Sequence, residues 1–346
     1  MRGLTWDHPR GYAPLDELTR LDLAGRNPYG EVPEPIEWDR QPLEGFESEP
    51  IAELCARYDV LVIDHPGLGA ALDALVPMED LFEPAELLSL RSGSAGRSYD
   101  SYHLDGRQWA LPLDAATQVA VTRPGVELPG TWPELPEFAR GTRLALCLGG
   151  PHAFLMFCAL CSGDFRDEEA GTRALELMAE LLALADREVS VLNPIGVLDA
   201  MTAGGPDCCP LVYGYATYPL AFADAPAWPG EPPGSVLGGT GLAVSGRRIG
   251  EIRDAVRAHL RRLLSEPVQT ELFPATGGQP AARAAWGSSP FYRDTLTTME
   301  AAWIRPRFPG YIALQERSSA LIRDGLLTRA PARDLLRDLH KEWRQQ

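Results

Sequence analysis

The stretch Val60-Leu61-Val62-Ile63 constrains the fold most, because it is apolar on both of its faces. A strand of this kind belongs to a parallel sheet that helices cover on both sides. The stretch ends at Asp64-His65-Pro66-Gly67, and its Ala/Leu-rich continuation predicts a helix from Leu68 to Leu75. The order strand, polar loop, helix is typical of α/β proteins.

The same order recurs along the chain. A strand from Gly3 to Trp6 precedes a loop and a helix that begins near Leu15, and an apolar strand from Leu144 to Leu148 precedes an apolar helix. With 346 residues, 45% of them hydrophobic, the chain is long enough for two cores. Ligands of α/β sheets bind outside the carboxyl ends of the strands. We therefore expect a cleft formed by the loops after Trp6, Ile63, Leu113, Leu148 and Val212.

Charge and hydropathy exclude two classes of partner. The formal net charge is −16, from 48 acidic and 32 basic residues, so nucleic acid phosphates would be repelled. No apolar run reaches the roughly 18 residues of a membrane-spanning helix, so no membrane insertion is expected. The six cysteines lack the spacing of a disulfide framework, and reduced, buried thiols are the prediction.

The N-terminal residues bear on location. A predicted strand follows Met1 almost at once, without the basic region, apolar region and cleavage site of a signal peptide. The sequence therefore predicts a cytoplasmic protein, or a periplasmic or extracellular one whose leader has been removed.

Two Asp-His pairs follow predicted strands, Asp7-His8 after the strand that ends at Trp6 and Asp64-His65 after the strand that ends at Ile63. Carboxylates accept hydrogen bonds from ligand hydroxyls, and a neutral imidazole donates or accepts them. Together with Arg10 these residues are candidate ligand contacts; the alternative is that they cap helices or brace loops. A metal site is not expected, because the spacing matches no known ligand motif.

Other candidates come from aromatic and helix-terminal residues. Tyrosine rings suit the C–H faces of sugars or flat rings, and Tyr213 and Tyr215 share one face of a strand. His152 stands before an apolar helix whose N-terminus could attract an anion or whose turn it could simply cap. The further candidates on this basis are Tyr99 and Tyr102.

The order of these segments resembles the family 1 extracellular solute-binding proteins, the maltose-binding-protein-like components of ABC importers. Leu4 to His8 is similar to the family's first strand and ligand loop, and Tyr58 to Asp64 to a strand that ends at a ligand-facing residue. Trp109 to Thr122 with Thr131 to Leu135 resembles the hinge strand and its following helix. Later matches are Leu237 to Ser245, Gly278 to Arg283 and Arg305 to Tyr311.

The resemblance implies a two-lobed, type II periplasmic-binding-protein-like fold with a ligand cleft between the lobes. It places residues 1–112 plus 243–300 in the first lobe and residues 113–242 plus 301–346 in the second. It also implies ligand contact by Arg307 and Tyr311, and by Asp114 at a hinge between two predicted strands, unless Asp114 only forms a hinge hydrogen bond.

Two functions remain open. One is a solute-binding protein that closes its lobes over a small polar molecule, a carbohydrate or similar metabolite, with an ABC permease as partner if the protein is exported. The other is a cytosolic enzyme of lyase, isomerase or cyclase type that uses Asp7, His8, Asp64 and His65 as acid–base groups. No nucleotide fingerprint or other cofactor motif is present, and no cofactor is predicted.

Overall fold

Three parallel strands, β1 to β3, form one side of the sheet in the first lobe. The computed structural model describes residues 1–287 and 289–344, apart from the side chains of residues 44, 47 and 48. Strand β1 (Arg2–Trp6) lies between β2 (Glu37–Gln41) and β3 (Val60–Ile63) and is parallel to both. All residues of β3 are buried, as its apolar sequence predicts. The α/β prediction is confirmed, and the carboxyl ends of β1 and β3 lie at the same edge of the sheet.

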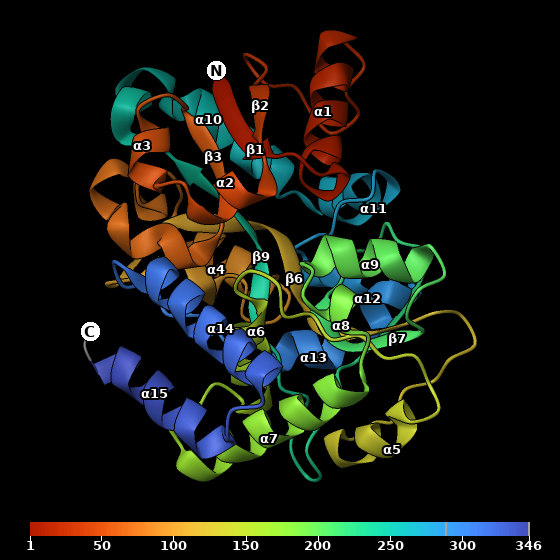
Figure 1. Ribbon diagram of the computed structural model, residues 1–346. Helices are drawn as coiled ribbons and strands as arrows, with labels where there is room; N and C mark the ends of the chain where they lie inside the picture. The colour runs from red at the N-terminus through yellow and green to blue at the C-terminus, as the bar shows by residue number, and fades with distance from the viewer. Residues whose placement is uncertain (288, 345–346) are drawn as a thin grey trace.

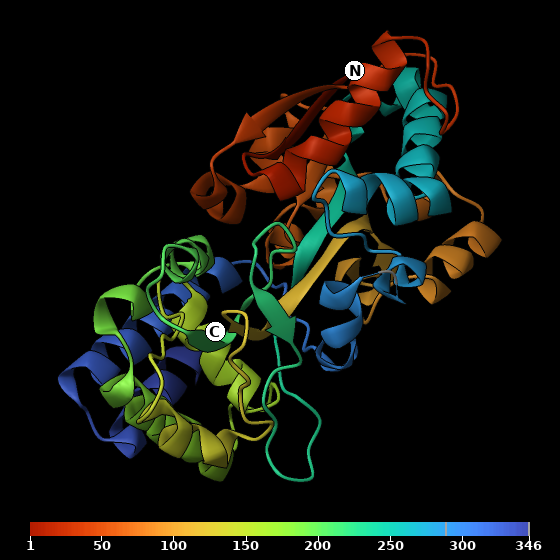
Figure 2. The ribbon, with the colours of Figure 1, turned by 90° about the vertical axis from the view of Figure 1, so that its right-hand side faces the viewer.

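Two long strands connect the lobes. β6 (Ala110–Thr122) and β9 (Leu237–Val244) pair in antiparallel fashion and run from the first lobe into the second (Figure 2). β9 also pairs with β3, while β6 pairs with β7 (Cys208–Tyr213) and β8 (Ala221–Ala223). A mixed sheet therefore passes through both lobes.

Some predicted elements are wrong. The chain does not turn at Asp114, because β6 runs through this residue with a register shift between Pro112 and Asp114. The predicted strand 144–148 forms only an isolated bridge, from Leu144 to Cys208. On its other side it hydrogen-bonds to the segment around α8, which ends at Ser190 and is helical, so no second strand pairs with it. The predicted helix from Leu68 to Leu75 consists of two 3₁₀ turns.

Long helices build the core of the second lobe: α6 (His152–Leu160), α7 (Glu168–Leu184), α14 (Tyr311–Thr328) and α15 (Ala332–Arg344) (Figure 1). Trp343 of α15 stacks on Phe154 of α6 at 5.5 Å between ring centroids. Its indole Nε1 donates to Ser318 Oγ of α14 at 3.0 Å. The apolar stripe of the amphipathic helix α15 is thus covered by α6, α7 and α14.

Shorter elements surround these cores. Within the described ranges, no helix is both long and apolar enough to cross a membrane. The short strands are β4 (His103–Leu104) and β5 (Arg107–Gln108). The remaining α-helices are α1 (Pro9–Leu23), α2 (Leu43–Ser48), α3 (Ile51–Cys55), α4 (Pro84–Ser92), α5 (Leu135–Ala139), α8 (Arg187–Ser190), α9 (Pro194–Thr202), α10 (Ile249–Leu263), α11 (Phe273–Ala275), α12 (Pro290–Asp294) and α13 (Leu296–Ala301). The 3₁₀ helices are η1 (His65–Ala70), η2 (Leu72–Ala74), η3 (Met78–Asp80), η4 (Asp100–Tyr102), η5 (Trp132–Glu134), η6 (Gly246–Arg248) and η8 (Arg283–Gly287), and η7 (Val268–Leu272) is a π-helix.

The lobe boundaries stay a prediction. Arg262 of α10 forms a bidentate ion pair with Asp22 of α1, at 2.6 and 2.7 Å, which joins the two helices. The segment from α12 to α13 instead contacts the neighbourhood of β8, where the rings of Phe291 and Phe222 lie 4.9 Å apart. The assignment of this segment to the first lobe stays a prediction.

Candidate functional site

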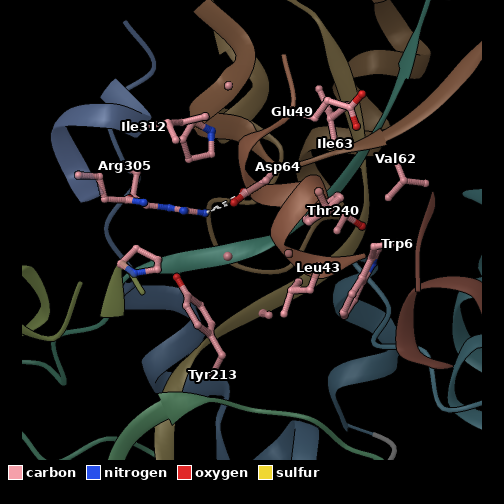
Figure 3. Close-up of a pocket in the computed structure, with 18 of the residues that line it drawn as sticks. Trp6, Leu43, Glu49, Val62, Ile63, Asp64, Tyr213, Thr240, Arg305 and Ile312 are labelled. Atoms are coloured by element: carbon pink, nitrogen blue, oxygen red, sulfur yellow. Dashed lines mark hydrogen bonds and ion pairs between the residues drawn. The ribbon is translucent and has the colours of Figure 1, made fainter. Parts of the chain in front are cut away.

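A cavity lies between the two lobes, with the crossing strands β6 and β9 beneath it (Figure 3). The first lobe contributes the carboxyl ends of β1 and β3 and the helices α2 and α3. The second lobe contributes the beginnings of α6 and α14 and the end of β7. Of the predicted site residues, Arg10, Asp64, His152, Tyr213 and Tyr215 line this cavity.

A buried ion pair between Arg305 and Asp64 forms one side of the cavity (Figure 3). Arg305 Nη2 donates to both carboxylate oxygens of Asp64 at 2.7 Å, and the backbone N–H of His65 donates to Asp64 Oδ1 at 2.8 Å. Burial would raise the pKa of Asp64, but Arg305 and the adjacent His65 side chain outweigh it and lower the pKa to about 2. Asp64 is therefore ionised at neutral pH, and it faces a permanently charged guanidinium.

A second buried ion pair joins Arg10 at the start of α1 to Asp114 in β6. Arg10 Nε donates to Asp114 Oδ2 at 2.8 Å, and Nη2 donates to the other carboxylate oxygen. The guanidinium also lies 4.9 Å from the ring centroid of Tyr215. Arg10 lines the cavity, whereas Asp114 lies behind it and holds the arginine in place. Of the two roles predicted for Asp114, ligand contact and a hydrogen bond at the hinge, the structure contains the hydrogen bond, which Arg10 donates.

Asp7 and His8 lie outside the cavity lining, although their strand leads to it through Trp6. His8 Nδ1 accepts a hydrogen bond from the backbone N–H of Arg10 at 3.1 Å, so the imidazole caps α1. Its ring stacks on Trp6 at 5.1 Å, and burial, with Arg10, lowers its pKa to about 4. Asp7 is exposed and lies 3.7 Å from Arg40. The alternative role of the first Asp-His pair, capping and bracing, is the one that the geometry shows.

His65 is completely buried beneath Asp64 and does not line the cavity. Its Nδ1 lies 3.2 Å from Asp64 Oδ1 without hydrogen-bond geometry, and neither ring nitrogen has a partner among the described residues. Burial, with the nearby Arg305, lowers its pKa to about 4. Tyr102 packs edge-on against this imidazole and donates its hydroxyl to the carbonyl of Ile63 at 3.2 Å. Both residues support the loop after β3 from below.

His152, Tyr213 and Tyr215 line the cavity from the second lobe. His152 begins α6, and its ring lies 5.7 Å from that of Tyr213. Burial, with Arg305, lowers the pKa of His152 to about 3, so the imidazole is neutral at pH 7. The Tyr213 hydroxyl donates to the carbonyl of Leu237 at 3.5 Å. Tyr213 and Tyr215 both line the cavity, although β7 ends at Tyr213 and Tyr215 lies beyond the strand.

Tyr99, Arg307 and Tyr311 lie away from the cavity. Tyr99 belongs to the core, where burial raises its pKa to about 12. Arg307 Nη1 donates to three backbone carbonyls of the segment 100–103 at 2.9 to 3.1 Å. Tyr311 is fully buried among the helices of the second lobe. These three side chains pack or form hydrogen bonds inside the protein and do not line the cavity.

Solved structures with the same arrangement are numerous, although no protein-family model and no curated protein matches this sequence. The maltose-bound MalE3 of T. maritima has a TM-score of 0.79 at 18% identity, over 99% of this chain and 98% of its own. A ribitol-bound ABC transporter solute-binding protein from Agrobacterium radiobacter K84 has a TM-score of 0.76 at 17% identity, over 99% and 97%. The chain has the two-lobed type II periplasmic-binding-protein fold.

A third structure of this type II fold extends the range of bound molecules. UgpB from Mycobacterium tuberculosis, in complex with glycerophosphocholine, has a TM-score of 0.76 at 17% identity, over 98% of this chain and 96% of its own. The likeness concerns the fold, and the chemistry of the cavity has to be derived from the side chains of this chain.

The type II cleft also contains residues that the sequence prediction did not include, chiefly Trp6, Arg305 and Gln315. Arg305 lies in the irregular segment between α13 and α14, outside any strand end. The signal in the sequence is the Arg305-Pro306-Arg307 segment, for which the family resemblance implies ligand contact by Arg307 rather than Arg305. A second signal was Asp64, because a carboxylate after a buried strand needs a counter-ion.

The acid–base alternative receives no support from the geometry. His65 is sealed from the cavity, His8 is a helix cap, and Asp7 points to solvent. Across residues 1–287 and 289–344, no group of three or more His, Cys, Asp or Glu side chains is placed to hold a metal ion.

Proposed function

We propose that this protein is a solute-binding protein that closes its two lobes over a small polar molecule. The observation that carries the proposal is the cavity between the lobes, whose walls contain the buried ion pair of Arg305 and Asp64. Hinge closure of two lobes brings such walls together around a ligand and excludes water from it. The structures of the same fold described above contain maltose, ribitol and glycerophosphocholine, which are all small polar molecules.

The proposed ligand contacts are Arg305, with Arg10, Asp64, His152, Tyr213 and Tyr215. The guanidinium of Arg305 donates hydrogen bonds, Asp64 accepts them, and the neutral His152 does either. The tyrosine rings offer apolar surface beside these groups. This combination suits a carbohydrate or a similar metabolite that carries both donors and acceptors.

The proposal is tested by native mass spectrometry of the protein purified from its own host. We expect an adduct of a few hundred daltons that is lost on denaturation. We also expect the Arg305→Met variant to lose the adduct, because a central hydrogen-bond donor is removed. An adduct that survives both Arg305→Met and Tyr213→Ala would contradict binding in this cavity.

Location and partner are further proposals. A cytoplasmic location is the prediction from the sequence, and an ABC permease is the partner if the protein is exported. Fractionation of host cells decides between them: recovery with the cytoplasmic fraction supports the first, and recovery outside the cytoplasmic membrane supports the second.

A further inference from the structure

With the exception of Glu316, the charged side chains around the cavity are paired with an opposite charge within the protein. Glu316 on α14 lines the cavity without an ion pair in the described part of the chain; burial raises the pKa of its carboxyl, and the nearby Arg323 offsets its charge. A ligand with one net charge would bring an unbalanced charge into the buried part of the site, which is unfavourable. The cavity therefore favours a ligand whose net charge is zero. The balanced pairs are Arg305 with Asp64, Arg10 with Asp114, and Glu49 with Arg57.

One end of the cavity is mainly apolar. Leu43 and Phe46 of α2 are half-buried beside it, and Leu43 lies next to Trp6 (Figure 3). The indole of Trp6 stacks with His8 and with Phe46, at 5.1 and 5.8 Å, and is only 3% exposed. It therefore offers no open face on which a sugar ring could lie. A polar side chain also lines this part of the cavity: Gln41 lies opposite Trp6 in the neighbouring strand, and its Oε1 has no partner among the described residues.

The opposite end is polar and has unused hydrogen-bonding capacity. Arg305 and Asp64 lie on the other side of the cavity from Trp6 and Leu43 (Figure 3). Arg305 Nε and His152 Nδ1 are buried and have no partner within the described residues. This end presents a cation and an anion next to each other, together with a neutral imidazole.

We propose that the ligand is an α-amino acid with an aliphatic side chain, bound as a zwitterion. Its carboxylate lies toward Arg305 and His152, its ammonium toward Asp64, and its side chain against Leu43, Phe46 and Trp6. The ligand carries both charges and is neutral overall, as the balanced cavity requires. This inference rests on the proposed function, since it names the class of the solute.

Isothermal titration calorimetry with defined probes tests the assignment. L-leucine and L-isoleucine are titrated beside 4-methylpentanoate, which lacks the ammonium, and 3-methylbutylamine, which lacks the carboxylate. We expect an amino acid to bind at least about tenfold more tightly than either singly charged analogue, because each analogue buries an unbalanced charge. Ribitol, mannitol and maltose form the third arm and are expected to bind weakly or not at all.

Variants locate the bound side chain. Leu43→Asn is expected to weaken L-leucine binding about tenfold, because it removes apolar surface from that end. Leu88→Asn is the matched control, since Leu88 on α4 is 67% exposed and lies outside the cavity. Binding of a polyol or maltose in place of the amino acids would overturn the assignment and leave the solute-binding proposal standing. Equal affinity for L-leucine and 4-methylpentanoate, or no binding of either amino acid, would also overturn it.

Discussion

At the scale of single residues, the ion pair of Arg305 and Asp64 is the feature on which the cavity depends. In Arg305→Met the largely buried Asp64 carboxylate loses its counter-ion, and we expect the free energy of unfolding to fall by about 3–5 kcal/mol. Urea denaturation at pH 7 measures the loss. The matched control is Arg337→Met, whose partner Asp334 is exposed and which should cost less than about 1 kcal/mol. Similar losses in both variants would contradict the importance of the buried pair.

Two buried histidines, His65 and His152, make the free energy of unfolding depend on pH. The pKa values of His65 and His152 fall from 6.5 to about 4 and about 3 on folding, so the unfolded chain binds more protons below pH 6.5. The free energy of unfolding should therefore decrease from about pH 6.5 to about pH 4, by up to about 1.4 kcal/mol per pH unit for each histidine. The stabilising effect of ionised Asp64 is lost only below this range, between its ordinary 3.8 and about 2.

Urea denaturation at pH 7, 6 and 5 tests this direction. His65→Phe should reduce the slope of stability against pH by about one proton, since one of the titrating groups is removed. Leu88→Asn changes an exposed position without a titratable group and should keep the wild-type slope. A slope that is the same in His65→Phe and the wild type would mean that this imidazole does not contribute.

At the scale of the element, the crossing strand β9 requires a glycine at position 239. Gly239 has φ +93°, and a Cβ there would lie 2.4 Å from the carbonyl oxygen of Asp114 in β6. We expect Gly239→Ala to lower the free energy of unfolding by about 1–3 kcal/mol, because a non-glycine residue is strained in this conformation. Gly250→Ala in α10 is the control and should raise stability by about 0.5–1 kcal/mol, since a Cβ there meets no atom within 4 Å. Thermal denaturation of both variants measures the difference.

The elements also show what the sequence could predict. The buried strand β3 and the strand end at Trp6 follow from apolar patterning and from the rule for ligand loops, and both lie at the cavity. The direction of a side chain after a strand end depends on local hydrogen bonds, which the pattern does not contain. His8 turns to the N–H of Arg10, and His65 turns beneath Asp64. β6 continues through Asp114 because it pairs with the distant strand β9, in which Thr240 lies opposite Asp114.

At the scale of the whole molecule, the order of segments along the sequence is sufficient to predict the two-lobed fold. The residues that form the wall of the cavity between the lobes can be identified only from the tertiary structure. Arg305 and Asp64 are 241 residues apart in sequence: Asp64 follows β3, and Arg305 lies in the irregular segment between α13 and α14. No local pattern connects them, so only the folded chain shows that they meet. The charge balance of the cavity, on which the proposed class of ligand depends, is for the same reason a property of the assembled lobes.

Closure of the lobes is the property of the whole molecule that binding should change. Both lobes and the crossing strands line the cavity, so a bound ligand should draw the lobes together and lower the radius of gyration measured by small-angle scattering. Hydrogen exchange should slow at the same ligand concentration in η1 of the first lobe and at the start of α6 in the second, because both become less accessible. Protection confined to one lobe, with an unchanged radius of gyration, would show that the ligand binds without closure. The exposed helix α4 is the internal control, since it contributes no residue to the cavity and its exchange should stay constant.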